Sequence, residues 1–219
     1  MPNLATIPVI LSYFLDSICI DRRSKPLSCS KNADDPDVHF LLGQAHAQQE
    51  DYPAALQEYS LALARDPHLP EAHYYKGLVY LHQGDLASAE TEFRAELEIR
   101  PGEVQTTYYL GYTLLAASSP EKAIPLFQDV LKAKPDFELA YFEIGRALFL
   151  QGDVTGAIDN LEKATKLNPG HDAAFFQLSQ ACRRAGYAEQ AQQALGTYQR
   201  LIETSRSKKR QSLEAPSPQ

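Results

Sequence analysis

Four glycines in the middle of the chain, Gly43, Gly77, Gly111 and Gly145, stand 34 residues apart, and Ser179 continues the series. The residues around each of them are also similar. A fixed period of this length is typical of proteins built from stacked repeats, in which each unit contacts only its neighbours. The period therefore predicts an elongated array of similar units rather than one irregular globule.

Each copy carries a small residue, a bulky residue and, in four copies, a proline at fixed distances after this landmark. They are Ala55, Ala89, Ala123, Ala157 and Ala191; Tyr59, Phe93, Phe127, Leu161 and Leu195; and Pro67, Pro101, Pro135 and Pro169. Two small residues on either side of a polar turn allow two antiparallel helices to approach closely. Proline has no backbone N–H and disfavours helix in the residue before it, so it separates one pair from the next. Each unit is predicted to be a helix, a turn, a second helix and a linker.

This pattern resembles the tetratricopeptide repeat family, whose small-residue, aromatic and proline positions are filled at matching offsets. The resemblance implies an all-α fold, a right-handed α-solenoid of five 34-residue units. The units are 36–69, 70–103, 104–137, 138–171 and 172–205. The tryptophan that is common four residues before the glycine is absent, and the residues in its place are His39, His73, Thr107, Tyr141 and Phe175. Pro125, inside the second helix of the third unit, is expected to bend that helix.

The segments on either side of the repeats have a different composition. Residues 1–35 are apolar over 7–20, a stretch shorter than the roughly 20 residues that span a bilayer and without a basic start. A cap on the first repeat, a disordered segment, a vestigial export signal or anchor, and peripheral membrane attachment all remain open. Residues 206–219 are predicted to be a basic helix end followed by a disordered tail.

Charge is distributed unevenly along the chain, whose net charge is −7. Residues 36–69 contain five acids and one basic residue, and residues 70–103 contain seven acids and three basic residues. The end of the chain is basic. An acidic protein is not expected to bind nucleic acid.

The sequence contains none of the motifs that mark common catalytic or metal sites. No phosphate-binding glycine loop or zinc-ligand spacing occurs. The three cysteines, Cys19, Cys29 and Cys182, do not form a disulfide framework. His39 and His73 recur at a position that normally packs between the two helices of a unit. We therefore expect a protein that is not an enzyme and that has no cofactor and no metal.

The resemblance implies that the first helices of the units line a concave groove. The position three residues before each landmark is aromatic in every copy; these five residues, Phe40, Tyr74, Tyr108, Phe142 and Phe176, are called the aromatic series below. Further candidate groove residues are Gln44, Tyr112, Arg146, Phe149, Gln180, Arg183 and Arg184. Aromatic side chains in a groove are suited to binding a peptide. They are equally suited to packing between adjacent first helices, and both interpretations stay open here.

Some members of the family bind the C-terminal carboxylates of chaperones through Lys, Asn and Arg side chains. The matching positions of this chain hold Phe40, Gln44 and Tyr75, so this carboxylate clamp is not expected. An apolar or mixed peptide with an acidic anchor near Arg146, Arg183 and Arg184 fits better. The function predicted is that of a scaffold or adaptor for a protein or peptide partner, in the cytoplasm.

Two alternatives remain. One is a membrane- or envelope-associated assembly factor, attached through residues 7–20, in which case the protein is membrane-associated or periplasmic. The other is a regulatory subunit that docks on an enzyme through its convex face.

Overall fold

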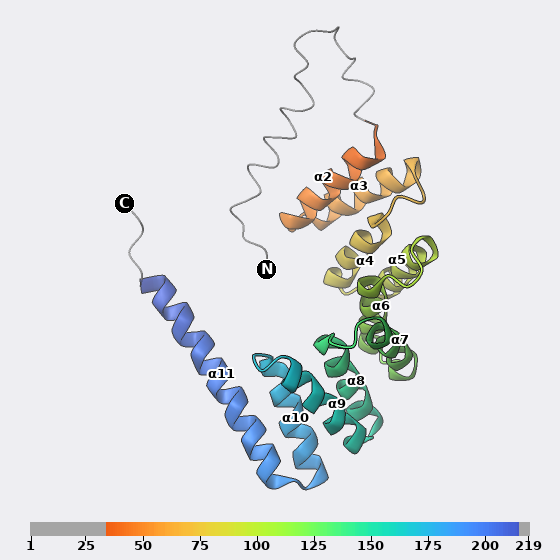
Figure 1. Ribbon diagram of the computed structural model, residues 1–219. Helices are drawn as coiled ribbons and strands as arrows, with labels where there is room; N and C mark the ends of the chain where they lie inside the picture. The colour runs from red at the N-terminus through yellow and green to blue at the C-terminus, as the bar shows by residue number, and fades with distance from the viewer. Residues whose placement is uncertain (1–33, 215–219) are drawn as a thin grey trace. The chain divides into compact units, whose positions relative to one another are not determined.

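The computed structural model describes residues 34–214, and in this part of the chain every regular element is a helix. The helices are α2 (Pro36–Gln48), α3 (Tyr52–Arg65), α4 (Ala72–Gln83), α5 (Leu86–Ile99), α6 (Val104–Ala116), α7 (Pro120–Ala133), α8 (Glu138–Gln151), α9 (Val154–Leu167), α10 (Asp172–Ala185) and α11 (Ala188–Glu214) (Figure 1). The predictions for the N-terminal segment and for the tail after Glu214 lie outside the described residues. Among the described helices, none has an apolar stretch long enough to cross a membrane.

The helices form five consecutive hairpins, α2–α3, α4–α5, α6–α7, α8–α9 and α10–α11. Each helix packs against the next one along the chain. The first helices of neighbouring hairpins also touch, since α2 contacts α4, α4 contacts α6, α6 contacts α8 and α8 contacts α10. This nearest-neighbour pattern is that of an α-solenoid, and the predicted all-α repeat fold is confirmed.

The periodic glycines lie where the two helices of a hairpin come closest. A Cβ atom built on Gly111 would lie 2.9 Å from the ring of Phe127, and one built on Gly77 would lie 2.8 Å from the ring of Phe93. Both rings are fully buried. Only a residue without a side chain leaves room for the ring, so the glycine and the bulky residue form one packing unit.

Caps fix the ends of the helices. Asp51, Asp85 and Asp153 accept hydrogen bonds from the backbone N–H groups three residues later, which the start of a helix leaves without partners. Gly84 and Gly152 end α4 and α8 with φ angles of 79° and 87°. Glycine adopts this left-handed conformation easily because it has no Cβ.

The recurring histidines also have a structural role. The Nδ1 atom of His39 lies 2.6 Å from Glu58, and that of His73 lies 2.6 Å from Glu92. Each contact joins the first helix of a hairpin to its second helix. A half-buried polar pair thus occupies the place where the tetratricopeptide repeat pattern commonly has tryptophan. No group of side chains suited to a metal ion occurs in the described part.

The glycine–ring contact predicts the effect of adding one methyl group. In the Gly111→Ala variant the new Cβ would overlap the Phe127 ring, and we expect the free energy of unfolding to fall by about 1–3 kcal/mol. Gly196, in α11, is the matched control, since nothing lies within 4 Å of a Cβ built there. Gly196→Ala should raise stability by about 0.5–1 kcal/mol through helix propensity. Urea unfolding followed by circular dichroism measures both, and equal effects would contradict the packing argument.

Candidate functional site

The aromatic series lies between neighbouring hairpins, and its members differ in exposure. Tyr108 and Phe142 are only 6% and 8% exposed, whereas Phe176 is 38% exposed. Phe40 and Tyr74 are half-buried. The series is therefore not a uniform ladder of accessible rings.

The ring contacts explain this burial. The Tyr108 ring lies 5.3 Å from that of Phe137, and the Phe142 ring lies 4.6 Å from that of His171. Phe137 and His171 directly precede α8 and α10, so both contacts reach the start of the next hairpin. For Tyr108 and Phe142 the structure thus supports packing between hairpins, and these rings have little surface left for a partner.

The arginines of the candidate groove are in three different situations. Arg146 forms an ion pair of 2.7 Å with Glu143 and lies over the ring of Phe142. Arg183 donates to the side chain of Gln180. Arg184 lies over the ring of Phe149, 5.2 Å from its centroid. The guanidinium of Arg146 is thus already engaged by the Glu143 side chain, which weakens the prediction that it anchors an acidic group of a partner.

By contrast, Arg183 and Arg184 are exposed and take part in no ion pair within the described part of the chain. Leu150, next to Phe149 at the end of α8, is 66% exposed. The half-buried Tyr112, Phe149 and Gln180 lie on α6, α8 and α10. The accessible candidates are therefore concentrated near the last two hairpins.

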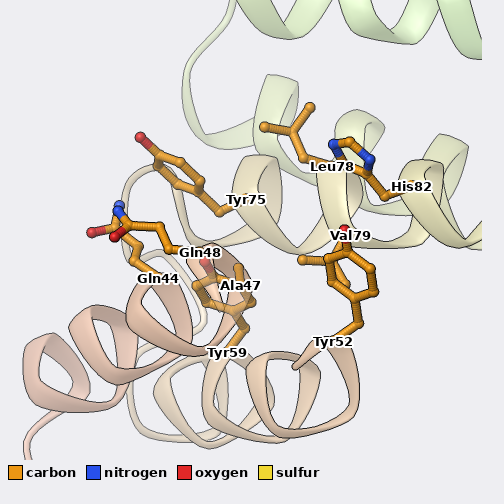
Figure 2. Close-up of a pocket in the computed structure, with 9 residues that line it drawn as sticks. All are labelled: Gln44, Ala47, Gln48, Tyr52, Tyr59, Tyr75, Leu78, Val79 and His82. Carbon is orange, nitrogen blue, oxygen red and sulfur yellow. The ribbon is translucent and has the colours of Figure 1, made fainter. Parts of the chain in front are cut away.

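A cleft of about 360 Å³ opens between the first and second hairpins, on α2, α3 and α4. Figure 2 shows its lining residues: Gln44, Ala47, Gln48, Tyr52, Tyr59, Tyr75, Leu78, Val79 and His82. Tyr59 and Val79 are buried and form its base, while Gln48 and His82 are exposed at its rim. The rings of Tyr52 and His82 are stacked, with an angle of 13° between their planes.

Two departures from the repeat pattern coincide with this cleft. Ala47 occupies a position that holds Leu81, Leu115 and Phe149 in the next three units. Tyr59 stands where two of the other units have phenylalanine. The small side chain leaves space, and the tyrosine adds a hydroxyl group to the base of that space.

The hydroxyl of Tyr59 is buried and has no hydrogen-bond partner among the described residues. Burial and the nearby Tyr75 raise the pKa of Tyr59, so the hydroxyl stays protonated. An unpartnered buried polar group costs free energy, about 1–3 kcal/mol. A ligand in the cleft that bonds to this oxygen recovers part of that cost.

Of the cleft residues, only Gln44 was a candidate from the sequence. The signal that identifies the cleft in the sequence is Ala47, the smallest residue at its repeat position. The sequence alone does not show which small residues leave a space unfilled, because that depends on the side chains of the neighbouring hairpin.

Glu143 is a buried carboxylic acid beside the candidate groove, paired with Arg146. Burial raises the pKa of Glu143 to about 7, although Arg146 acts in the opposite direction. In the unfolded chain this carboxyl ionises near its ordinary pKa of about 4.3. Between these two values the folded protein holds a proton that the unfolded chain releases.

The contribution of Glu143 to the free energy of unfolding should therefore fall as pH rises from about 5 to about 7. Replacing the carboxyl in Glu143→Gln removes this contribution, so we expect the variant to lose less stability over that interval. Glu121→Gln, at an exposed position of α7, is the control and should follow the wild type. Unfolding free energies measured at several pH values test this, and identical pH dependence in wild type and Glu143→Gln would refute it.

The amino-acid sequence also matches profiles of a known protein family. A profile described as tetratricopeptide repeat matches residues 30–70, 40–104 and 108–172, and a second profile of the same description matches residues 148–201. No curated protein matches the chain at a significant level.

The solved structures with similar folds include the following three. MamA from Desulfovibrio magneticus RS-1, from residue 41 to its end, is 23% identical with a TM-score of 0.70, and the match covers 80% of this chain and 97% of that one. YrrB, described as a tetratricopeptide protein with an unusual peptide-binding site, is 23% identical with a TM-score of 0.67, and 78% and 89% are covered. PilW, described as a type IV pilus biogenesis factor, is 23% identical with a TM-score of 0.69, and 77% and 78% are covered.

At this identity the structural likeness establishes the fold alone. The sequence profiles, however, match most of the chain, from residue 30 to residue 201. The chain belongs to the tetratricopeptide repeat family.

Proposed function

We propose that this protein is a non-enzymatic scaffold that binds a peptide segment of a partner protein across its first helices. The observation that carries this proposal is the cleft between α2 and α4, which has an unpartnered hydroxyl at its base. If these repeats served only for packing, a larger side chain could fill this space. Leu81 and Leu115 show that the equivalent position of the next two units accommodates a leucine.

The remaining residues of the proposed contact surface are those whose side chains are exposed on the first helices. We call the surface formed by the accessible candidate residues of α2, α4, α6, α8 and α10, together with the exposed Leu150 of α8, the first-helix face. Leu150 and Phe176 offer apolar contacts there, and Arg183 and Arg184 offer an anchor for an acidic group. The peptide-binding site described for YrrB supports such a use of this fold. A segment long enough to reach from the cleft to α10 would meet both ends of this face.

A pair of double variants tests the proposal. Leu150→Ser with Arg184→Ala changes the first-helix face, and Leu61→Ser with Arg94→Ala changes exposed residues of α3 and α5. We expect the first-helix variant to retain about one tenth of the wild-type amount of a captured partner. The α3 and α5 variant should capture as the wild type does. Tagged full-length protein, cell lysate and quantitative mass spectrometry give the measurement, with circular dichroism as a check of folding.

The opposite result identifies the regulatory-subunit alternative. If the variant of α3 and α5 loses partners that the first-helix variant keeps, docking takes place through the second helices, and the proposed function fails.

The envelope-associated alternative concerns where the scaffold works. The apolar residues 7–20 and the likeness to PilW, described as a pilus biogenesis factor, favour it. Our first proposal places the scaffold in the cytoplasm. We expect the full-length protein in the soluble fraction after cell lysis and ultracentrifugation. Recovery in the membrane fraction that carbonate washing does not reverse would support the anchored form instead.

A further inference from the structure

We propose that the cleft between α2 and α4 binds the guanidinium group of an arginine side chain from the partner peptide. This inference rests on the proposed peptide-binding function and specifies its chemistry. It is the opposite of a carboxylate clamp, since the ligand group is a cation.

The polar groups of the cleft suit a donor-rich ligand. The Tyr59 hydroxyl oxygen and the amide oxygens of Gln44 and Gln48 can all accept hydrogen bonds. None of the lining residues is a lysine, an arginine or a carboxylate. Arginine presents five N–H donors in one plane, so it can reach several of these acceptors at once.

The aromatic walls suit a flat cation. Tyr52, Tyr59, Tyr75 and His82 all contribute rings to the lining. A guanidinium group stacks on such rings and is attracted to the faces of tyrosines. The volume of about 360 Å³ lies within the range of ligand pockets, roughly 300–1,000 Å³.

The chain itself places a guanidinium at the equivalent site of another pair of hairpins. Ala47 and His82 line the cleft between the first and second units, and their repeat equivalents in the fourth and fifth units are Phe149 and Arg184. There the Arg184 guanidinium lies over the Phe149 ring and approaches its carbonyl oxygen at 3.5 Å. Between the first two hairpins no such arginine is built in, and the space is open.

Charge favours a cation at this end of the array. Residues 36–103 contain twelve acids and four basic residues, whereas residues 104–205 contain eleven and nine. Basic residues of this part of the chain are held by carboxylates: Lys76 by Glu92 at 2.9 Å, Arg94 by Glu90 at 2.8 Å and Arg100 by Glu96 at 2.6 Å. The excess negative charge attracts an incoming arginine and repels a carboxylate.

The test uses a small probe so that it does not depend on knowing the partner. N-acetyl-arginine-N-methylamide is titrated into the ¹⁵N-labelled full-length protein, and the amide shifts of α2 and α4 are followed by NMR. We expect saturable shifts at the cleft. The citrulline analogue, which keeps the shape but lacks the charge, should bind about three- to thirtyfold more weakly, as expected for loss of a cation–π contact, and the leucine analogue should not bind there.

Two variants locate the probe. Ala47→Leu fills the cleft and should abolish the shifts, whereas Ala116→Leu, at an exposed position of α6, should leave them unchanged. Tyr59→Phe removes only the hydroxyl and should weaken binding. It should also fold at least as stably as the wild type, because phenylalanine occupies the same position in the second and third units and no buried hydroxyl remains unpartnered.

The outcomes separate this inference from the proposed function. Equal binding of the arginine and citrulline probes, or arginine shifts that persist in Ala47→Leu, would overturn the arginine assignment. If in that case the first-helix variant still loses its captured partner, the scaffold function stands while the arginine site falls. Loss of the shifts in Ala47→Leu together with the preference for arginine supports the site even if partner capture fails.

Discussion

The close approach of two helices within each hairpin is the contact on which the whole array depends. Because Gly111 has no side chain, the Phe127 ring can fill the space between α6 and α7. The same contact recurs between Gly77 and Phe93. Because the distance between the two helices is fixed there, the turns, caps and linkers can repeat at one length. Neighbouring hairpins can then pack against one another in the same way each time.

The candidate site is a modification of that same contact. In the first hairpin the ring that packs against Gly43 belongs to Tyr59, whose hydroxyl has no partner in the described structure. The small Ala47 leaves the neighbouring space open. A buried polar group without a partner is uncommon in folded proteins and calls for an explanation. The ligand binding that we propose would provide one here, and the repeat scaffold holds the rest of the cleft in place.

Aromatic residues at a repeated position proved ambiguous for a physical reason. The first-helix positions that the resemblance places in the groove are also those closest to the next hairpin. Tyr108 and Phe142 are covered by residues of the following segment, whereas Phe176 is accessible. Charged residues were ambiguous in the same way, since the Arg146 side chain contacts the buried Glu143 instead of remaining available for a partner. Recurrence shows that a position matters but does not show what covers it.

The sequence by itself determined the helical hairpins, their period and the pairing of glycine with a bulky residue, because these depend on spacing within one unit. It also predicted that no carboxylate clamp occupies the expected positions. Only the tertiary structure decided which of the equivalent residues are accessible. Leu195 and Leu161 hold the same repeat position, yet Leu195 is 38% exposed and Leu161 is fully buried. The cleft, the Glu143–Arg146 pair and the unpartnered hydroxyl of Tyr59 likewise depend on the neighbouring hairpin, since burial is set by the side chains that a neighbour brings and not by position in the repeat.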